Sequence, residues 1–214
     1  MSTTTNQLSS QIAEALLRVE AVALRPDEPF TWTSGIKSPI YCDNRITISH
    51  PDVREMIAEG FAALVRELHP DAEVIAGIAT GGIPHGAWVA QKLGLPMVYI
   101  RDKPKGHGKQ NQIEGVLRPG QKVVAIEDLI STGGSSLKAA MAVREAGGQM
   151  LGVLAIFSYE FEKAAAAFAE QNIPLRTLSG YTSLLEVAAR TGRIAPEQVE
   201  LLQAWRANPS AYGN

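Results

Sequence analysis

Two carboxylates stand directly before a glycine-rich loop in KVVAIEDLISTGGSS, at residues 122–136. The carboxylates are Glu127 and Asp128, at the end of a hydrophobic run. Glycines let the backbone wrap closely around a ligand, and the start of a helix attracts anions. The hydroxyl donors of the loop are Ser131, Thr132 and Ser135. A loop of this kind is suited to bind one phosphate monoester group.

The two acids must face something other than that phosphate, because carboxylates repel it. They suit sugar hydroxyls, a magnesium ion or a cationic transition state. The plainer alternative is a strand-to-helix turn with an N-cap, in which Glu127 and Asp128 are a solvated strand end. The complete string favours a ligand-binding site over that alternative.

A second candidate is the cation-rich loop RDKPKGHGKQNQIEG, at residues 101–115. Its cationic and imidazole side chains are Arg101, Lys103, Lys105, His107 and Lys109. The loop could be a solvated surface segment, a nucleic-acid patch or a lid that closes over an anionic substrate. It lacks the interleaved aromatic residues of a nucleic-acid patch. A diphosphate leaving group needs several cations and a proton donor, and this loop contains both.

The order of apolar segments predicts how these loops are positioned. Continuous apolar runs predict five strands, at residues 73–79, 97–101, 122–128, 149–158 and 174–179. Helices are predicted between them, at residues 82–94, 135–147 and 160–171. Strands of this type are buried on both faces, which indicates an α/β fold with a central, mainly parallel five-stranded sheet flanked by helices. Ligands bind such sheets beyond the carboxyl ends of the strands, where both acids lie.

The two ends of the chain do not follow this alternation of strands and helices. We expect a frayed tail over the first 11 residues, a helix at 9–24 and two short strands within 28–45. Weaker helical patterns occupy 181–190 and 196–206, and a strong one runs from 51 to 68. The prediction is one domain, residues 1–214, in which 46–180 form the core. Residues 1–45 and the C-terminal tail would form a small hood over one edge of the sheet.

Composition narrows the class of protein. The chain has 214 residues, 45% of them hydrophobic, and a net charge of −2, which argues against general nucleic-acid binding. No apolar run reaches the roughly 18 residues that cross a membrane, and the N-terminus lacks the pattern of a secretory signal. Cys42 is the only cysteine, which excludes an intrachain disulfide and fits a reducing, cytoplasmic location.

Residues 122–136 closely resemble the 5-phosphoribosyl 1-diphosphate (PRPP) motif of type I phosphoribosyltransferases. Neither a Walker A loop nor a dinucleotide-binding fingerprint occurs in the chain. The pattern R-x-x-x-K-x-H-G, at 101–108, looks like the catalytic loop of orotate phosphoribosyltransferases. FTWTSGIKSPIYCDNR, at 30–45, resembles the segment that walls their orotate pocket. The resemblance covers roughly residues 10–180.

The resemblance implies a type I phosphoribosyltransferase fold and a magnesium-dependent reaction. PRPP and orotate would give orotidine 5-monophosphate and diphosphate, a step of pyrimidine biosynthesis. Magnesium would be held mainly by PRPP and water rather than by protein ligands. The family also implies a homodimer in which the lid loop reaches the neighbouring subunit's site. Two alternatives remain: a purine phosphoribosyltransferase, against which residues 30–45 count, and a PRPP-sensing regulator without catalysis.

Site residues carry over from the family motifs one by one. The catalytic candidates are Lys105, His107 and Asp128. The PRPP-binding candidates are Arg101, Lys105, His107, Glu127, Asp128, Leu129, Ile130, Ser131, Thr132, Gly133, Gly134 and Ser135. The orotate candidates are Ser131, Lys37, Tyr41 and Cys42, although Lys37 is equally a surface lysine and Cys42 a small buried filler. The diphosphate loop would use the backbone of Thr80, Gly81 and Gly82.

Three positions depart from the enterobacterial type of this family, which has lysine where this chain has Thr33, Gly81 and Asp102. Lys103 or Lys109 is the expected substitute for the lysine lost at Asp102. The departures bear on the diphosphate end of the site and leave the PRPP motif unchanged. His85 follows a proline beside the diphosphate loop, and we expect it to have a packing role.

Overall fold

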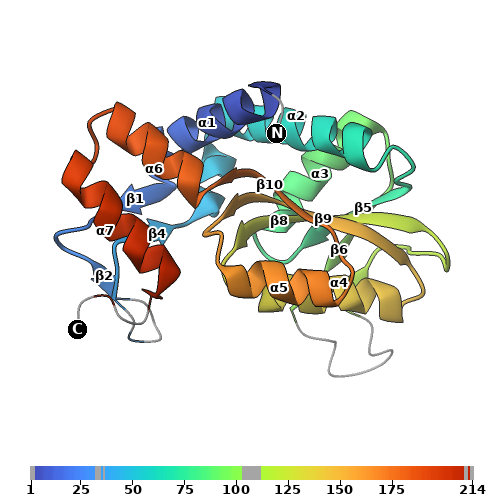
Figure 1. Cartoon of the computed structure of the whole chain (residues 1–214). Coiled ribbons are helices and arrows are strands. Elements are labelled where there is room, and N and C mark those ends of the chain that lie inside the picture. Colours follow the sequence, from blue (N-terminus) through green and yellow to red (C-terminus); the bar gives the residue numbers. More distant parts are fainter. Residues whose placement is uncertain (1–2, 32–34, 36, 103–111, 210–211, 213–214) are drawn as a thin grey trace.

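The computed structural model describes residues 3–31, 35, 37–102, 112–209 and 212 (Figure 1). Its helices are α1 (Thr3–Arg18), η1 (Asn44–Ser49), α2 (Pro51–Leu68), α3 (Gly82–Leu93), α4 (Gly134–Glu145), α5 (Glu162–Glu170), α6 (Tyr181–Arg190) and α7 (Pro196–Ala207). Its strands are β1 (Val22–Leu24), β2 (Phe30–Thr31), β3 (Lys37–Ser38), β4 (Ile40–Cys42), β5 (Val74–Ile78), β6 (Met97–Ile100), β7 (Ile113–Glu114), β8 (Lys122–Ile130), β9 (Gln149–Ser158) and β10 (Leu175–Gly180). Within these residues, no helix is both long and apolar enough to cross a membrane.

The central sheet has six strands in the order β10-β9-β8-β5-β6-β7. The first five are parallel, which confirms the five predicted strands and the α/β class. The sixth, β7, was not predicted. It pairs antiparallel with β6 and has only two residues, near the end of the cation-rich loop, so no apolar run marks it.

Both faces of the sheet are covered, as the continuous apolar runs require (Figure 1). Side chains alternate between the two faces along each strand. In β5, Ile75 belongs to the core beneath α1, α2 and α3, whereas Val74 and Ala76 belong to the core against α4 and α5. Because the central strands are buried on both sides, they need apolar residues at every position.

The predicted frayed tail and the predicted helix at 9–24 are both wrong in their bounds. The helix begins at Thr3 and ends at Arg18. Ile12 and Leu16 are fully buried, and the partly buried Leu8 packs on the same core, so tertiary contacts extend toward the N-terminus as far as Leu8. Residues 22–24 instead form β1, which pairs antiparallel with β4.

The segment 28–45 contains the predicted pair of strands, since β2 and β3 pair antiparallel. Of the turn between them, the structure describes Gly35, which has the positive φ of 83° that favours glycine. The end of the segment is not a strand. Asp43 caps η1 by accepting a hydrogen bond from the backbone N–H of Arg45 at 3.1 Å, and this starts the helix at Asn44.

The C-terminal helices are anchored by an aromatic cluster. Trp205 of α7 is buried against Tyr159, Phe161 and Tyr181, with ring centroids 5.4 to 5.9 Å apart. Helix α6 packs on α1, so the two terminal regions lie beside each other (Figure 1). The division of the chain into a hood and a core remains a prediction.

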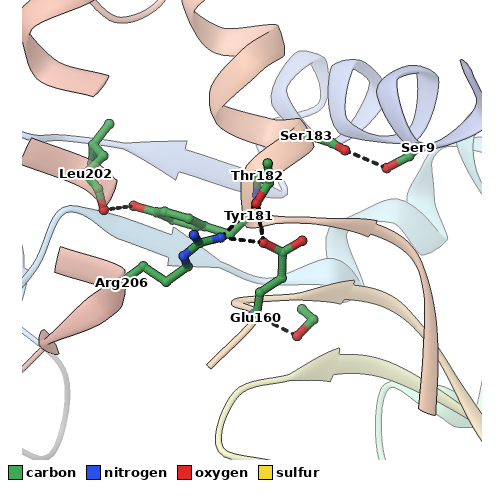
Figure 2. Close-up of polar contacts among 8 residues, drawn as sticks. Ser9, Glu160, Tyr181, Thr182, Ser183, Leu202 and Arg206 are labelled. Carbon is green, nitrogen blue, oxygen red and sulfur yellow. Dashed lines mark hydrogen bonds and ion pairs between the residues drawn. The ribbon is translucent and has the colours of Figure 1, made fainter. Parts of the chain in front are cut away.

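A polar cluster at Glu160 joins α6 and α7 to the end of β9 (Figure 2). The Glu160 carboxylate accepts hydrogen bonds from the backbone N–H and hydroxyl of Thr182, at 3.1 and 2.5 Å. It also accepts one from the guanidinium of Arg206, at 2.7 Å. Glu160 itself has a φ of 58°, an uncommon backbone conformation for glutamate, so these three bonds hold a strained turn in place.

We predict that Arg206→Ala lowers the free energy of unfolding by about 1–2 kcal/mol, because it removes a charged donor from a partly buried cluster. The matched control is Arg190→Ala. Arg190 meets Glu14 at 3.8 Å with 63% and 61% of the two side chains exposed, against 33% and 34% for Arg206 and Glu160. Chemical denaturation measures both variants. Equal losses would contradict a special role for the Glu160 cluster.

His85 of α3 has the packing role that the sequence predicts. Its ring is fully buried, lies edge-on to Trp88 at 5.3 Å, and places Nε2 3.3 Å from the hydroxyl of Thr47. Burial lowers the pKa of His85 from 6.5 to about 4. The ring is therefore neutral in the folded protein at neutral pH.

This pKa makes stability depend on pH. The unfolded chain binds a proton at His85 below pH 6.5, and the folded protein does so only below about 4, so stability falls as the pH drops across that window. We predict a loss of about 3 kcal/mol from this one group. His85→Leu should remove that part of the slope between pH 7 and 4 in urea unfolding. An unchanged slope would show that His85 does not titrate as we propose.

Candidate functional site

A cavity of about 440 Å³ opens at the carboxyl ends of β5 and β8. It is lined by Cys42, Asp43, Arg45, Ala79, Thr80, Gly81, Glu127, Asp128, Leu129, Ser131, Thr132, Gly133, Ser135 and Ser136. Parallel strands bring their carboxyl ends to one edge of a sheet. The cavity therefore unites the PRPP-motif segment, the predicted diphosphate loop and part of the segment at 30–45.

The predicted phosphate loop leads directly into α4. Gly133 has a φ of 79°, and a Cβ there would lie 3.1 Å from Phe168 of α5, so both the backbone and the packing favour glycine. The first turn of the helix leaves backbone N–H groups without intrahelical partners, and the helix dipole favours an anion there. Ile130 is fully buried in the core and does not line the cavity, and its backbone oxygen accepts a hydrogen bond from the N–H of Tyr159 at 3.1 Å.

The side chain of Asp128 lies directly over Gly81. A Cβ built at Gly81 would lie 2.2 Å from Asp128 Oδ2, so any side chain there would require the Asp128 carboxylate to move. The backbone of Gly81 has a φ of −67° and a ψ of −30°, which every residue adopts, so the contact with Asp128 is the reason for glycine.

Glu127 is oriented differently from Asp128. Only 5% of it is exposed, and its carboxylate accepts hydrogen bonds from the hydroxyl of Ser136 at 2.8 Å and from the N–H of Asp128 at 2.9 Å. Burial, with the neighbouring Asp128 carboxylate, raises the pKa of Glu127 well above its ordinary value. Glu127 thus connects β8 to the first turn of α4. The predicted contact between Glu127 and the ribose stays a prediction.

The predicted diphosphate loop lies across the cavity from the phosphate loop. Thr80 and Gly81 line the cavity, together with Ala79. Gly82 does not line it, and a Cβ there would lie 2.2 Å from the backbone oxygen of Ile126. Gly82 therefore allows the start of α3 to pack closely on β8.

The orotate candidates of the N-terminal segment separate into two groups. Cys42 lines the cavity, whereas Lys37 and Tyr41 are exposed and do not line it. Alternation along β4 explains this, because Ile40 and Cys42 point inward and the 47%-exposed Tyr41 points outward onto Phe30. Burial, then the charges of Asp128 and Asp43, raise the pKa of the Cys42 thiol well above its usual range.

Sequence reasoning did not single out Asp43, Arg45 and Ser136, which also line the cavity. The guanidinium of Arg45 donates two hydrogen bonds to the Asp43 carboxylate, at 2.6 and 2.7 Å, and lowers the pKa of Asp43. Among the described lining residues, Arg45 is the sole cation beside three carboxylic side chains. A signal for Asp43 and Arg45 was present in the sequence, because both residues belong to the motif at 30–45 that resembles the orotate pocket segment.

Lys105 and His107 lie outside the described residues, as do Lys103 and Lys109. The two ends of their loop are described and are joined to each other. The N–H of Arg101 donates to the backbone oxygen of Gln112 at 2.8 Å, and the side chain of Gln112 donates to the oxygens of Arg101 and Asp102 at 3.2 Å. Arg101 pairs with Glu114 at 3.4 Å and does not line the cavity.

Comparisons with known proteins agree with this geometry. A family model described as phosphoribosyl transferase domain matches residues 47–179. The orotate phosphoribosyltransferase of Enterococcus faecalis (strain ATCC 47077 / OG1RF) is 58% identical over 207 residues, which is 97% of this chain and 99% of that protein.

Solved structures show the same fold. The orotate phosphoribosyltransferase of Aeropyrum pernix superposes with a TM-score of 0.74 and 25% identity, over 86% of this chain and 99% of that chain. The UMP synthase of Leishmania donovani matches with a TM-score of 0.77 and 26% identity, over 92% of this chain but only 42% of the longer one. The family model matches most of this chain, and the Enterococcus faecalis protein is 58% identical over 97% of it. The chain therefore belongs to the phosphoribosyl transferase domain family, among the orotate phosphoribosyltransferases.

Proposed function

We propose that this protein transfers ribose 5-phosphate from PRPP to orotate, giving orotidine 5-monophosphate and diphosphate. The observation that carries this proposal is the single cavity in which Asp128, the loop at 131–135 and the loop at 79–81 meet. Its three parts suit the ribose, the 5-phosphate and the diphosphate of one PRPP molecule. Family membership supports orotate as the acceptor.

In the proposed reaction, the bond between C1 of the ribose and the diphosphate oxygen breaks ahead of attack. Positive charge then develops on the ring, as it does in glycoside cleavage. The Asp128 carboxylate stabilises that charge and accepts hydrogen bonds from the ribose hydroxyls. The loop at 131–135 holds the 5-phosphate, and the backbone at Thr80 and Gly81 holds the diphosphate.

Orotate would attack C1 through N1, already deprotonated in the bound dianion, from the face opposite the diphosphate. Ser131 and Cys42 line the cavity and are the orotate candidates best placed for contact. Lys37 of β3 and Tyr41 of β4 would have to reach orotate from their exposed positions. The high pKa of Cys42 keeps the thiol neutral, so it serves as a wall and not as a nucleophile.

The charges of the cavity indicate that PRPP binding needs additional cations. Three carboxylic side chains and one guanidinium cannot by themselves neutralise PRPP. Magnesium held mainly by PRPP and water would supply part of the missing positive charge, and it needs no protein ligand for this. The ion, when bound, would neutralise diphosphate charge.

The lid supplies the remaining cations in this proposal. Lys105 and His107 would contact the diphosphate, with one subunit's loop completing the site of its partner in a homodimer. The joined loop ends at Arg101 and Gln112 provide a fixed base for such a lid. A cytoplasmic location belongs to the same proposal and fits the single cysteine.

An ultraviolet assay of base consumption tests the function. We expect PRPP and magnesium to support loss of orotate, with no loss in parallel tubes of adenine, hypoxanthine or uracil. Consumption of a purine would keep the PRPP site but overturn the acceptor. Tight PRPP binding without turnover of any base would favour a PRPP-sensing regulator.

A substitution at Gly81 tests the assignment of Asp128. Gly81→Ala places a methyl group where the Asp128 carboxylate lies, so the carboxylate must move. We predict that kcat/KM for PRPP falls by about ten- to a hundred-fold. Gly192→Ala is the control, since Gly192 has a φ of 68° and the substitution costs stability at the end of α6, away from the cavity. Wild-type kinetics for Gly81→Ala would contradict the assignment of Asp128 to the ribose ring.

A further inference from the structure

We propose that Asn44 is a positioning residue for Asp128, the acid assigned to the ribose ring in the proposed function on which this inference rests. Asn44 was not among the candidates from the sequence, and it does not line the cavity. Its side-chain nitrogen donates a hydrogen bond to the backbone oxygen of Asp128 at 2.6 Å. The contact joins η1 to the end of β8 across 84 positions of the chain.

This bond is the only one that the Asn44 side chain makes among the described residues. Asn44 is 1% exposed, and its side-chain oxygen has no hydrogen-bond partner there. A buried amide with one unpaired oxygen costs stability compared with a well-packed apolar side chain. Stability alone therefore does not explain asparagine at this position. The bond to the backbone of Asp128 gives a reason to keep it.

Asn44 is itself firmly held. Its backbone oxygen accepts a hydrogen bond from the hydroxyl of Thr47 at 2.6 Å, and Thr47 in turn contacts His85 of α3. Asp43 caps the same turn through the backbone of Arg45. The turn at 43–47 is thus attached to the helix that begins in the diphosphate loop.

The consequence for Asp128 is geometric. Fixing its carbonyl oxygen fixes the peptide plane after Asp128, and with it the direction of the side chain toward Gly81. Catalytic groups lose rate steeply when displaced by about 1 Å. Asn44, Thr47 and His85 therefore hold the ribose acid in register with the diphosphate loop, through polar contacts buried beneath the cavity.

The test compares Asn44→Ala with Ser179→Ala. Ser179 is also buried and also donates to a distant backbone oxygen, that of Ser9 at 2.9 Å, but it lies on β10 away from the cavity. Measured well below both melting temperatures, Asn44→Ala should lower kcat by about ten- to a hundred-fold. Ser179→Ala should keep wild-type kcat despite a comparable fall in melting temperature.

A double-mutant cycle separates positioning from general damage. If Asn44 acts through the Asp128 carboxylate, Asn44→Ala should cost less than about two-fold when added to Asp128→Asn. Additive losses, or kcat of Asn44→Ala equal to that of Ser179→Ala, would overturn the proposal. Asn44→Asp, which has the same shape but no donor at that atom, should be at least as impaired as Asn44→Ala.

The outcome is separable from that of the proposed function. Wild-type turnover of orotate is measured first, and its absence would refute the function alone. PRPP binding by titration calorimetry then tests Asn44 without turnover. If the wild type turns over no orotate, weaker PRPP binding by Asn44→Ala than by Ser179→Ala would support the positioning role, and equal binding would reject it.

Discussion

The alternation of side chains along β8 determines the different roles of its two acids. Val123 and Ala125 face α4 and α5, whereas Val124 and Ile126 face α1, α2 and α3. Continued along the strand, this alternation directs Glu127 toward α4 and Asp128 toward the start of α3. The structure shows this arrangement, with Glu127 bonded to Ser136 of α4 and Asp128 over Gly81. Adjacent acids thus contact opposite walls of one cavity.

The parallel pairing of β5 with β8 makes that arrangement useful. Gly77 pairs with Ile126, so β5 ends one residue later, opposite Glu127, and the loop that follows it begins level with Asp128. Gly82 then allows α3 to begin against the backbone of β8, and Gly81 leaves space for the Asp128 carboxylate. Neither glycine is needed for an unusual backbone conformation at these two positions. Both are explained by close approach between segments that are distant in sequence.

The sequence predicted those parts of the protein that depend on local pattern. Apolar runs gave the five parallel strands, and the hydroxyl- and glycine-rich string indicated the phosphate loop. Parts that depend on tertiary contacts were missed or misjudged. The first turns of α1 are polar and rich in Thr and Ser, so the packing of Leu8 on the core is not visible locally. The link from Asn44 to Asp128 has no local signal either, because it spans two distant segments.

The electrostatics of the cavity connect the described site to the rest of the proposed enzyme. A site for a highly anionic substrate would ordinarily be lined with cations, yet Arg45 is already paired with Asp43. Burial favours the neutral form of Glu127, which reduces repulsion, and in the proposed function the stabilisation of a cationic ring falls to Asp128. A permanently cationic wall would pair with Asp128 in the absence of substrate. In the proposed function, cations that arrive with PRPP, as magnesium or on the lid, would leave Asp128 available until the substrate is bound.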